Sequence, residues 1–140
     1  MRIARRGLLL GALGLPLAAC GSRSDVPAVK AALQQAVEAR PEYRDGQVHY
    51  RDDASAGTTI GGVLRLEGAD RDAAASSLEA VLEAVIRTYQ DQPDVREAFV
   101  RLEAHPAGDD SARVLTTDVV PPSDDRANTT TEDLKEHFGL

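Results

Sequence analysis

The sequence predicts an α+β fold, a two-layer sandwich in which two helices lie on one face of a four-stranded antiparallel sheet. Apolar residues recur at every third or fourth position over residues 26–37 and 70–90, which is the pattern of an amphipathic helix. Each of these helices is followed by two segments in which apolar and polar residues alternate, as in half-buried strands. The predicted order is therefore αββαββ. One apolar stripe per helix and one apolar face per strand allow both helices to cover the same side of one sheet.

The first half of the predicted domain contains one helix and one hairpin. The helix is expected to begin at Ser24 or Asp25, because either side chain can cap its first turn, and to end before Pro41. Alternation over residues 47–51 and 59–66 predicts two strands, and the polar segment between them predicts a hairpin loop. This half therefore forms one helix-hairpin unit.

The second half repeats this order. Residues 70–90 are the longest periodic segment and would form a helix about 30 Å long. Strands are predicted over residues 95–104 and 113–120, separated by a loop that contains Pro and Gly. The chain then becomes polar, and residues 129–138 can form a short helix with Gly139 at its end.

The N-terminus resembles the precursor of a bacterial lipoprotein. Residues 1–6 carry arginines and no acid, residues 7–17 are apolar, and small residues precede Cys20, in the three-part layout of a secretory signal peptide. Leu17-Ala18-Ala19-Cys20 is similar to the lipobox of that family. The resemblance implies that the Cys20 thiol receives a diacylglycerol and that cleavage before Cys20 makes this residue the new N-terminus.

The lipobox divides the chain into expected segments: a signal peptide at residues 1–19, a lipidated tether at 20–24, the α+β domain at 25–120, and a polar tail with a short C-terminal helix at 121–140. The alternative is a plain signal peptide, or a membrane anchor, followed by an incidental cysteine. The apolar run is shorter than the ~20 residues that span a bilayer, which argues against an anchor. Arg5-Arg6 also resembles part of a twin-arginine export signal, so this route and general secretion both stay open.

The charge of the chain argues against nucleic acid as a partner. Removing residues 1–19 takes three arginines from the 16 basic residues, so 13 remain against 23 acidic residues, and 13 − 23 gives a net charge of −10. This charge has the wrong sign for binding nucleic acid. Cys20 is the only cysteine, so its acylation would leave no thiol for a disulfide or a metal site. Richness in Ala, Arg, Asp and Val, with few lysines, resembles proteins of GC-rich bacteria such as actinobacteria.

Part of the chain resembles the BON domains of bacterial envelope proteins. Residues 29–33, Val-Lys-Ala-Ala-Leu, are similar to their first helix, and residues 62–68, Gly-Val-Leu-Arg-Leu-Glu-Gly, are similar to their central strand. The resemblance runs over residues 26–104 and implies an association with envelope membranes and phospholipid. The αββαββ elements are therefore expected to be arranged either as in a BON domain or as in a ferredoxin-like domain.

No sequence motif indicates catalysis, a cofactor or a metal. His49, His105 and His137 lie far apart, without HExxH or H-x3-H spacing. The paired aspartates lack the alternate carboxylates and distal Glu of a calcium loop. Gly61-Gly62 lacks the Lys-Ser/Thr that completes a phosphate-binding loop, and predicts a bulge or a close backbone approach instead. We therefore expect no enzyme activity and no catalytic, metal or cofactor site.

One set of strand residues forms a candidate binding face. If the apolar strand residues face the helices, alternation places the intervening side chains on the other side of the sheet. Basic and aromatic side chains gathered there on an acidic domain can hold an anionic or aromatic group. The alternative is a solvated face on which each arginine pairs with a nearby carboxylate. The candidate residues are His49, Arg51, Arg65, Phe99 and Arg101.

Together these observations predict a lipid-anchored extracytoplasmic protein that acts as a small binding or scaffolding module of the cell envelope. Its expected partners are the membrane, reached through acyl chains on Cys20, and an envelope protein or anionic ligand. The alternative is a carrier that holds a lipid or other apolar ligand between helices and sheet, and the third possibility is an envelope enzyme. A cavity of ~300 Å³ or more behind the sheet would favour the carrier.

Overall fold

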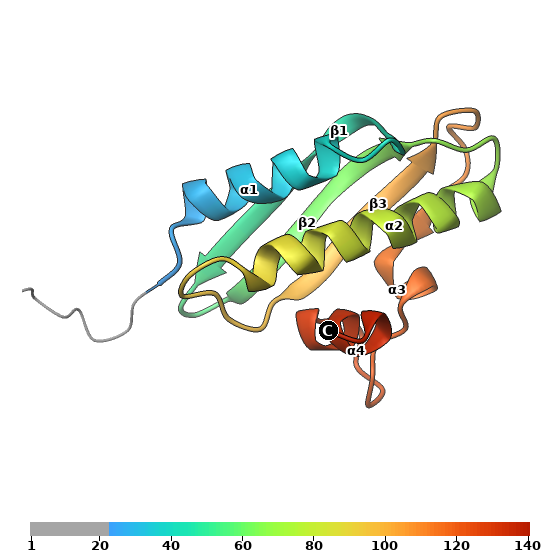
Figure 1. Cartoon of the computed structure of the whole chain (residues 1–140). Coiled ribbons are helices and arrows are strands. Elements are labelled where there is room, and N and C mark those ends of the chain that lie inside the picture. The colour runs from blue at the N-terminus through green and yellow to red at the C-terminus, as the bar shows by residue number, and fades with distance from the viewer. Residues whose placement is uncertain (1–22) are drawn as a thin grey trace, which may run out of the picture.

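A computed structural model describes residues 23–140, so Cys20 and the rest of the lipobox lie outside the described residues. This part of the chain is an α+β fold, as predicted, with a four-stranded sheet (Figure 1). In chain order the elements are α1 (Val26–Glu38), β1 (Tyr43–Asp53), β2 (Gly57–Leu66), α2 (Arg71–Gln90), β3 (Phe99–Pro106), β4 (Val114–Leu115), α3 (Thr116–Val119) and α4 (Thr131–Phe138).

The sheet is mixed, so the prediction of an antiparallel sheet is wrong at one pair of strands. The strands lie in chain order, and β2 runs parallel to β3, whereas β1–β2 and β3–β4 are antiparallel. The connection between β2 and β3 explains this. The 20 residues of α2 span about 30 Å and the 10 residues of β2 span about 33 Å, so α2 returns the chain to the end of the sheet at which β2 began. β3 must then run in the same direction as β2.

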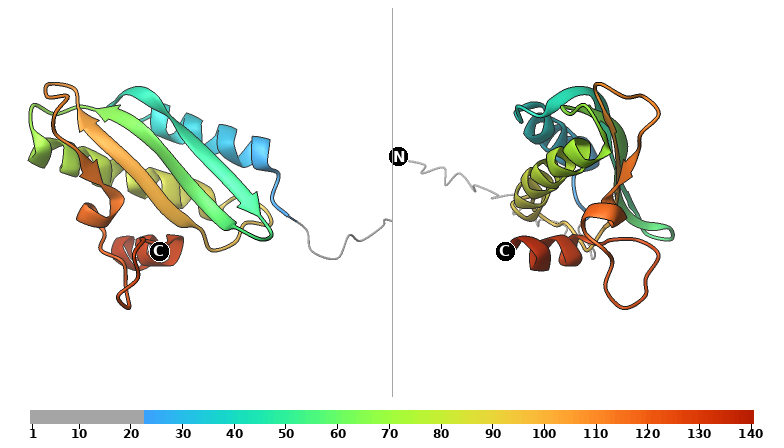
Figure 2. Two further views of the ribbon diagram at one scale, coloured as in Figure 1. Left: turned by 180° about the vertical axis from the view of Figure 1, so that it is seen from behind. Right: turned by 90° about the vertical axis from the view of Figure 1, so that its right-hand side faces the viewer.

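Helices α1 and α2 both lie on one face of the sheet, and the C-terminal segment lies along the far side of β3 (Figure 2). The apolar stripes of the two helices are buried, and alternate residues of the strands meet them. The strand residues predicted to face the helices are all at most 4% exposed: Val48, Tyr50, Ile60, Leu64, Leu66, Val100 and Leu102. This burial confirms the strand register on which the candidate binding face depends.

The predicted helix ends are confirmed by their hydrogen bonds. The Asp25 side chain accepts a hydrogen bond from the backbone N–H of Ala28 and caps α1. Thr130 and Asp133 form a reciprocal capping box at the start of α4, and Gly139 ends this helix with a φ of 68°. Ser24 is the other candidate cap of α1, but its hydroxyl instead donates a hydrogen bond to the Asp52 carboxylate at the end of β1.

The strand predicted over residues 113–120 is confirmed only at β4, Val114–Leu115, and its predicted length is wrong, because α3 begins at Thr116. The Thr116 hydroxyl accepts a hydrogen bond from Leu102 N–H at 3.0 Å and donates one to Leu102 C=O at 2.9 Å. A single side chain thus replaces the backbone partner that a longer β4 would supply. The backbone is then free to turn, and Asp118 accepts from Leu115 N–H at the start of α3.

The segment after Val120 packs along the edge of β3. Thr129 C=O accepts from Val100 N–H at 2.8 Å, and Thr131 N–H donates to Ala98 C=O at 2.9 Å. Leu134 of α4 belongs to the core. Among residues 23–140, no helix combines the length and the apolar character that crossing a membrane would require.

Candidate ligand-binding face

The strand register places the predicted binding residues in neighbouring rows on the sheet face away from α1 and α2, which we call the open face. One row contains His49, Gly61 and Arg101, and the row beside it contains Arg51, Thr59 and Phe99. Arg65 lies further along β2, beside Asp45 of β1 and His105 of β3. The whole open face comprises Asp45, Gln47, His49, Arg51, Thr59, Gly61, Val63, Arg65, Phe99, Arg101, Glu103 and His105.

The structure brings three of these five residues together. His49, Arg51 and Arg101 line one hollow of about 490 Å³, which we call the basic hollow. Its lining is completed by Lys30, Tyr50, Thr59, Gly61 and Gly62. Arg65 is separate, because it forms an ion pair with Asp110 of the loop before β4. Phe99, which is 39% exposed, borders a different hollow near Arg126 and Thr130.

Lys30 is the residue that sequence reasoning missed. It lies on α1, whose buried stripe is Val29, Leu33 and Val37, so Lys30 itself is exposed. Helical spacing does not show that α1 lies beside β1. Only the packing of α1 along β1 brings Lys30 into the lining of the same hollow as residues about 20 positions later in the chain.

The basic hollow has no carboxylate among its lining residues. Most arginines in the described part of the chain form ion pairs with carboxylates: Arg40, Arg44, Arg65, Arg71, Arg87, Arg113 and Arg126. Arg51, Arg101 and Lys30 form none with any carboxylate of residues 23–140. Within the described residues Arg23 and Arg96 also form no ion pair, but the basic hollow brings three such cations together on a chain whose formal net charge is −7.

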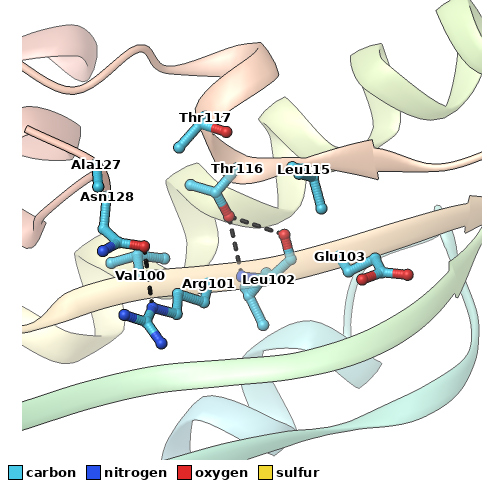
Figure 3. Close-up of a pocket in the computed structure, with 9 residues that line it drawn as sticks. All are labelled: Val100, Arg101, Leu102, Glu103, Leu115, Thr116, Thr117, Ala127 and Asn128. Carbon is cyan, nitrogen blue, oxygen red and sulfur yellow. Dashed lines mark hydrogen bonds between the residues drawn. The ribbon is translucent and has the colours of Figure 1, made fainter.

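Arg101 is held in position by a polar contact outside the basic hollow. Its Nε donates a hydrogen bond to Asn128 Oδ1 at 3.0 Å, and Figure 3 shows the guanidinium turned toward Asn128. The nearest acidic residue on β3, Glu103, instead contacts His105 at 2.7 Å and Arg113 at 3.9 Å. The guanidinium thus keeps its terminal N–H groups for another partner.

A second hollow, of about 250 Å³, lies on the other side of Arg101 (Figure 3). It lies between β3, the turn from β4 into α3, and the loop that contains Asn128. The Thr116 hydroxyl at its wall is already engaged by the backbone of Leu102. Arg101 lines both hollows, so it is the residue that connects them.

A buried polar cluster closes the end of the sheet where the chain enters the domain. The Ser24 hydroxyl lies 2.7 Å from Tyr50 Oη and 2.6 Å from the Asp52 carboxylate. The hydrogen bond from Ser24 holds the pKa of Asp52 below its usual range, and burial raises the pKa of the neighbouring Tyr89. Each of these groups has a partner, so the cluster stabilises the hairpin end and offers no free group to a ligand.

Groups of His, Cys, Asp or Glu that could hold a metal ion do not occur within residues 23–140. Comparison of the whole chain with protein-family models, with curated proteins and with solved structures found no match.

Proposed function

We propose that the protein is a lipid-anchored binding module of the bacterial cell envelope that engages an anionic partner through its open face. The observation that carries this proposal is the basic hollow. Like charges that lie close together without counter-charges repel one another, and an anionic partner removes that repulsion. The hollow also lies on the face that no helix covers in the described part of the chain (Figure 2).

The proposal of a lipid anchor is supported by the N-terminal sequence alone. Leu17-Ala18-Ala19-Cys20 follows a basic and an apolar segment, and it lies outside the described residues. Two acyl chains on one cysteine hold a domain firmly at a membrane, whereas one chain holds it only marginally. The proposed location is therefore extracytoplasmic, with the α+β domain attached through a tether of a few residues.

We also propose that the domain is a two-layer sandwich of the BON-like kind. The support is the position of α1 and α2 on one face in two views (Figures 1 and 2) and the burial of their stripes against the sheet. A ferredoxin-like domain is built from split βαβ units. Here β2 and β3, which α2 connects, are direct neighbours, so this alternative has less support.

A carrier of an apolar ligand has less support than a binding module. The space between helices and sheet is filled by side chains such as Leu33, Leu64, Leu82 and Leu102, each 0% exposed. Hollows of about 490 and 330 Å³ are present, but they lie at the surface and are lined largely by polar residues. An apolar ligand usually occupies a concave, mostly apolar pocket.

The proposal can be tested by crosslinking in native envelopes followed by purification of the anchored protein. The test variant is Arg51→Gln with Arg101→Gln, and the matched control is Arg71→Gln with Arg87→Gln, which removes the same charge from two ion-paired arginines of α2. We expect the test variant to lose a crosslinked partner that the control keeps. Equal recovery of the same partners by both variants would contradict a role for the basic hollow.

A further inference from the structure

The floor of the basic hollow is Gly61. In its row, Gly61 lies between His49 and Arg101, and neighbouring strands are about 4.8 Å apart, so these two side chains stand about 10 Å from each other with no side chain between them. The backbone does not require glycine here. A Cβ at Gly61 would have one close neighbour, the Arg101 carbonyl oxygen at 3.6 Å, which is an ordinary contact. The missing side chain therefore leaves open space rather than relieving strain.

The walls of the hollow supply more positive charge than one carboxylate can balance. Lys30, Arg51 and Arg101 are three permanent cations at neutral pH, and His49 adds ring nitrogens that can hydrogen-bond. A phosphate monoester carries about −1.5 to −2 charges and three acceptor oxygens at pH 7. Arginine guanidinium groups bind such oxygens in pairs, and lysine adds a compact positive charge.

We infer that the basic hollow is a binding site for a phosphate group, carried either by a soluble phosphate ester or by a lipid headgroup. The inference rests on the proposed function, because it names the chemistry that the open face would recognise. Gly61 provides the space for the phosphate, Arg51 and Arg101 provide paired N–H donors, and Lys30 closes the side next to α1. Arg101 bonds to Asn128 through Nε, which leaves its terminal N–H groups for the phosphate.

The first test measures binding of inorganic phosphate, glycerol phosphate and acetate to the purified full-length lipoprotein in detergent, from shifts of the His49 ring resonances in NMR spectra. We expect both phosphate compounds to bind more tightly than acetate, with affinity that falls as salt is raised. Arg51→Gln with Arg101→Gln should weaken phosphate binding by about tenfold or more. Arg87→Gln, on α2 and paired with Glu83, should leave it unchanged.

A second variant separates the site from overall charge. Gly61→Leu keeps every charge but fills the floor of the hollow, so it should abolish phosphate binding while the thermal midpoint stays close to that of the wild type. If leucine prevents folding, Gly61→Val tests the same point with a smaller apolar side chain. Full phosphate binding by a folded Gly61 variant would overturn the inference, as would acetate binding as tight as phosphate.

The source of the phosphate is identified by inserting the lipoprotein into nanodiscs of phosphatidylcholine with or without phosphatidic acid, whose headgroup is a phosphate monoester. Headgroup binding predicts His49 shifts that appear only with phosphatidic acid and disappear in Gly61→Leu. Binding of glycerol phosphate alone would assign a soluble ester, and binding of neither overturns the inference. The proposed function fails separately from this inference. It fails if phosphate binds in the basic hollow but the two double variants recover the same crosslinked partners.

Discussion

At the scale of single residues, the adjacent glycines of β2 have different roles. Gly62 has a φ of 142°, and a Cβ there would lie 2.1 Å from the Gln47 carbonyl oxygen, so its backbone requires glycine. Gly61 has neither constraint. The sequence predicted a bulge or close backbone approach for the pair, and the close approach is confirmed at Gly62. Nothing in the sequence distinguishes the two, because the difference depends on the pairing of β1 with β2.

This difference gives a stability prediction. Gly62→Ala should lower the free energy of unfolding by more than about 2 kcal/mol, because it combines an unfavourable φ with a clash against backbone that cannot move. Gly61→Ala should change it by less than about 1 kcal/mol. Urea unfolding of the two full-length variants, followed by circular dichroism, measures both values. Equal losses would show that the register of β1 against β2 differs from the one described.

At the scale of elements, one long-range contact and the length of one helix explain what the sequence analysis did not predict. Apolar and polar residues do alternate over residues 113–120. The strand nevertheless ends after two residues, because the Thr116 side chain hydrogen-bonds to the backbone of Leu102 on β3. Alternation also carries no information on strand direction, so the parallel pairing of β2 with β3 follows only from the length of α2. The helices and their caps were predictable, because capping and amphipathic spacing are local in sequence.

The hairpin between β1 and β2 makes a prediction about acid stability. Backbone N–H groups of Ala56 and Ser55 lower the pKa of Asp53 to about 2, and the hydrogen bond from Ser24 lowers the pKa of Asp52. Both groups have a lower pKa in the folded than in the unfolded chain, where Asp titrates near 3.9. Their stabilisation is thus fully present above about pH 4 and is lost as pH falls toward 2.

The measurement is the urea midpoint of the full-length protein between pH 5 and pH 2. The wild type should lose stability steadily below pH 4, and Asp52→Asn with Asp53→Asn should lose less over the same interval, because neither side chain can then take up a proton. An identical decline in the two proteins would mean that other carboxylates govern acid unfolding.

At the scale of the whole molecule, an acidic chain brings to one hollow on the open face three cations that form no ion pair within residues 23–140: Lys30, Arg51 and Arg101. The alternation of apolar and polar residues along the strands, with the apolar ones expected to face the helices, was enough to predict that His49, Arg51 and Arg101 share this face. The separation of Arg65 and the contribution of Lys30 were not predictable, because Asp110 and α1 reach the sheet from distant parts of the chain. Side-chain direction is a local property of a strand, whereas the neighbours of a side chain depend on the packing of the entire domain.

The proposed lipid anchor on Cys20 predicts how the whole protein is distributed in the cell. Cys20→Ala should abolish acylation, because it removes the only thiol, and should release the domain from the membrane or leave the precursor uncleaved. Metabolic labelling with a fatty acid, followed by membrane fractionation, measures both effects. Label on the Cys20→Ala protein would show that acylation occurs elsewhere.

The central claim is that the open face, and not the helical layer, is the interaction surface. The most direct measurement places a photoreactive amino acid either at Thr59, in the basic hollow, or at Ser76, on the exposed side of α2, and irradiates intact cells. Crosslinks should form from position 59, should be absent from position 76, and should disappear from position 59 when Arg51 and Arg101 are both replaced by Gln. Crosslinks of equal yield from the two positions, or from position 76 alone, would contradict the account.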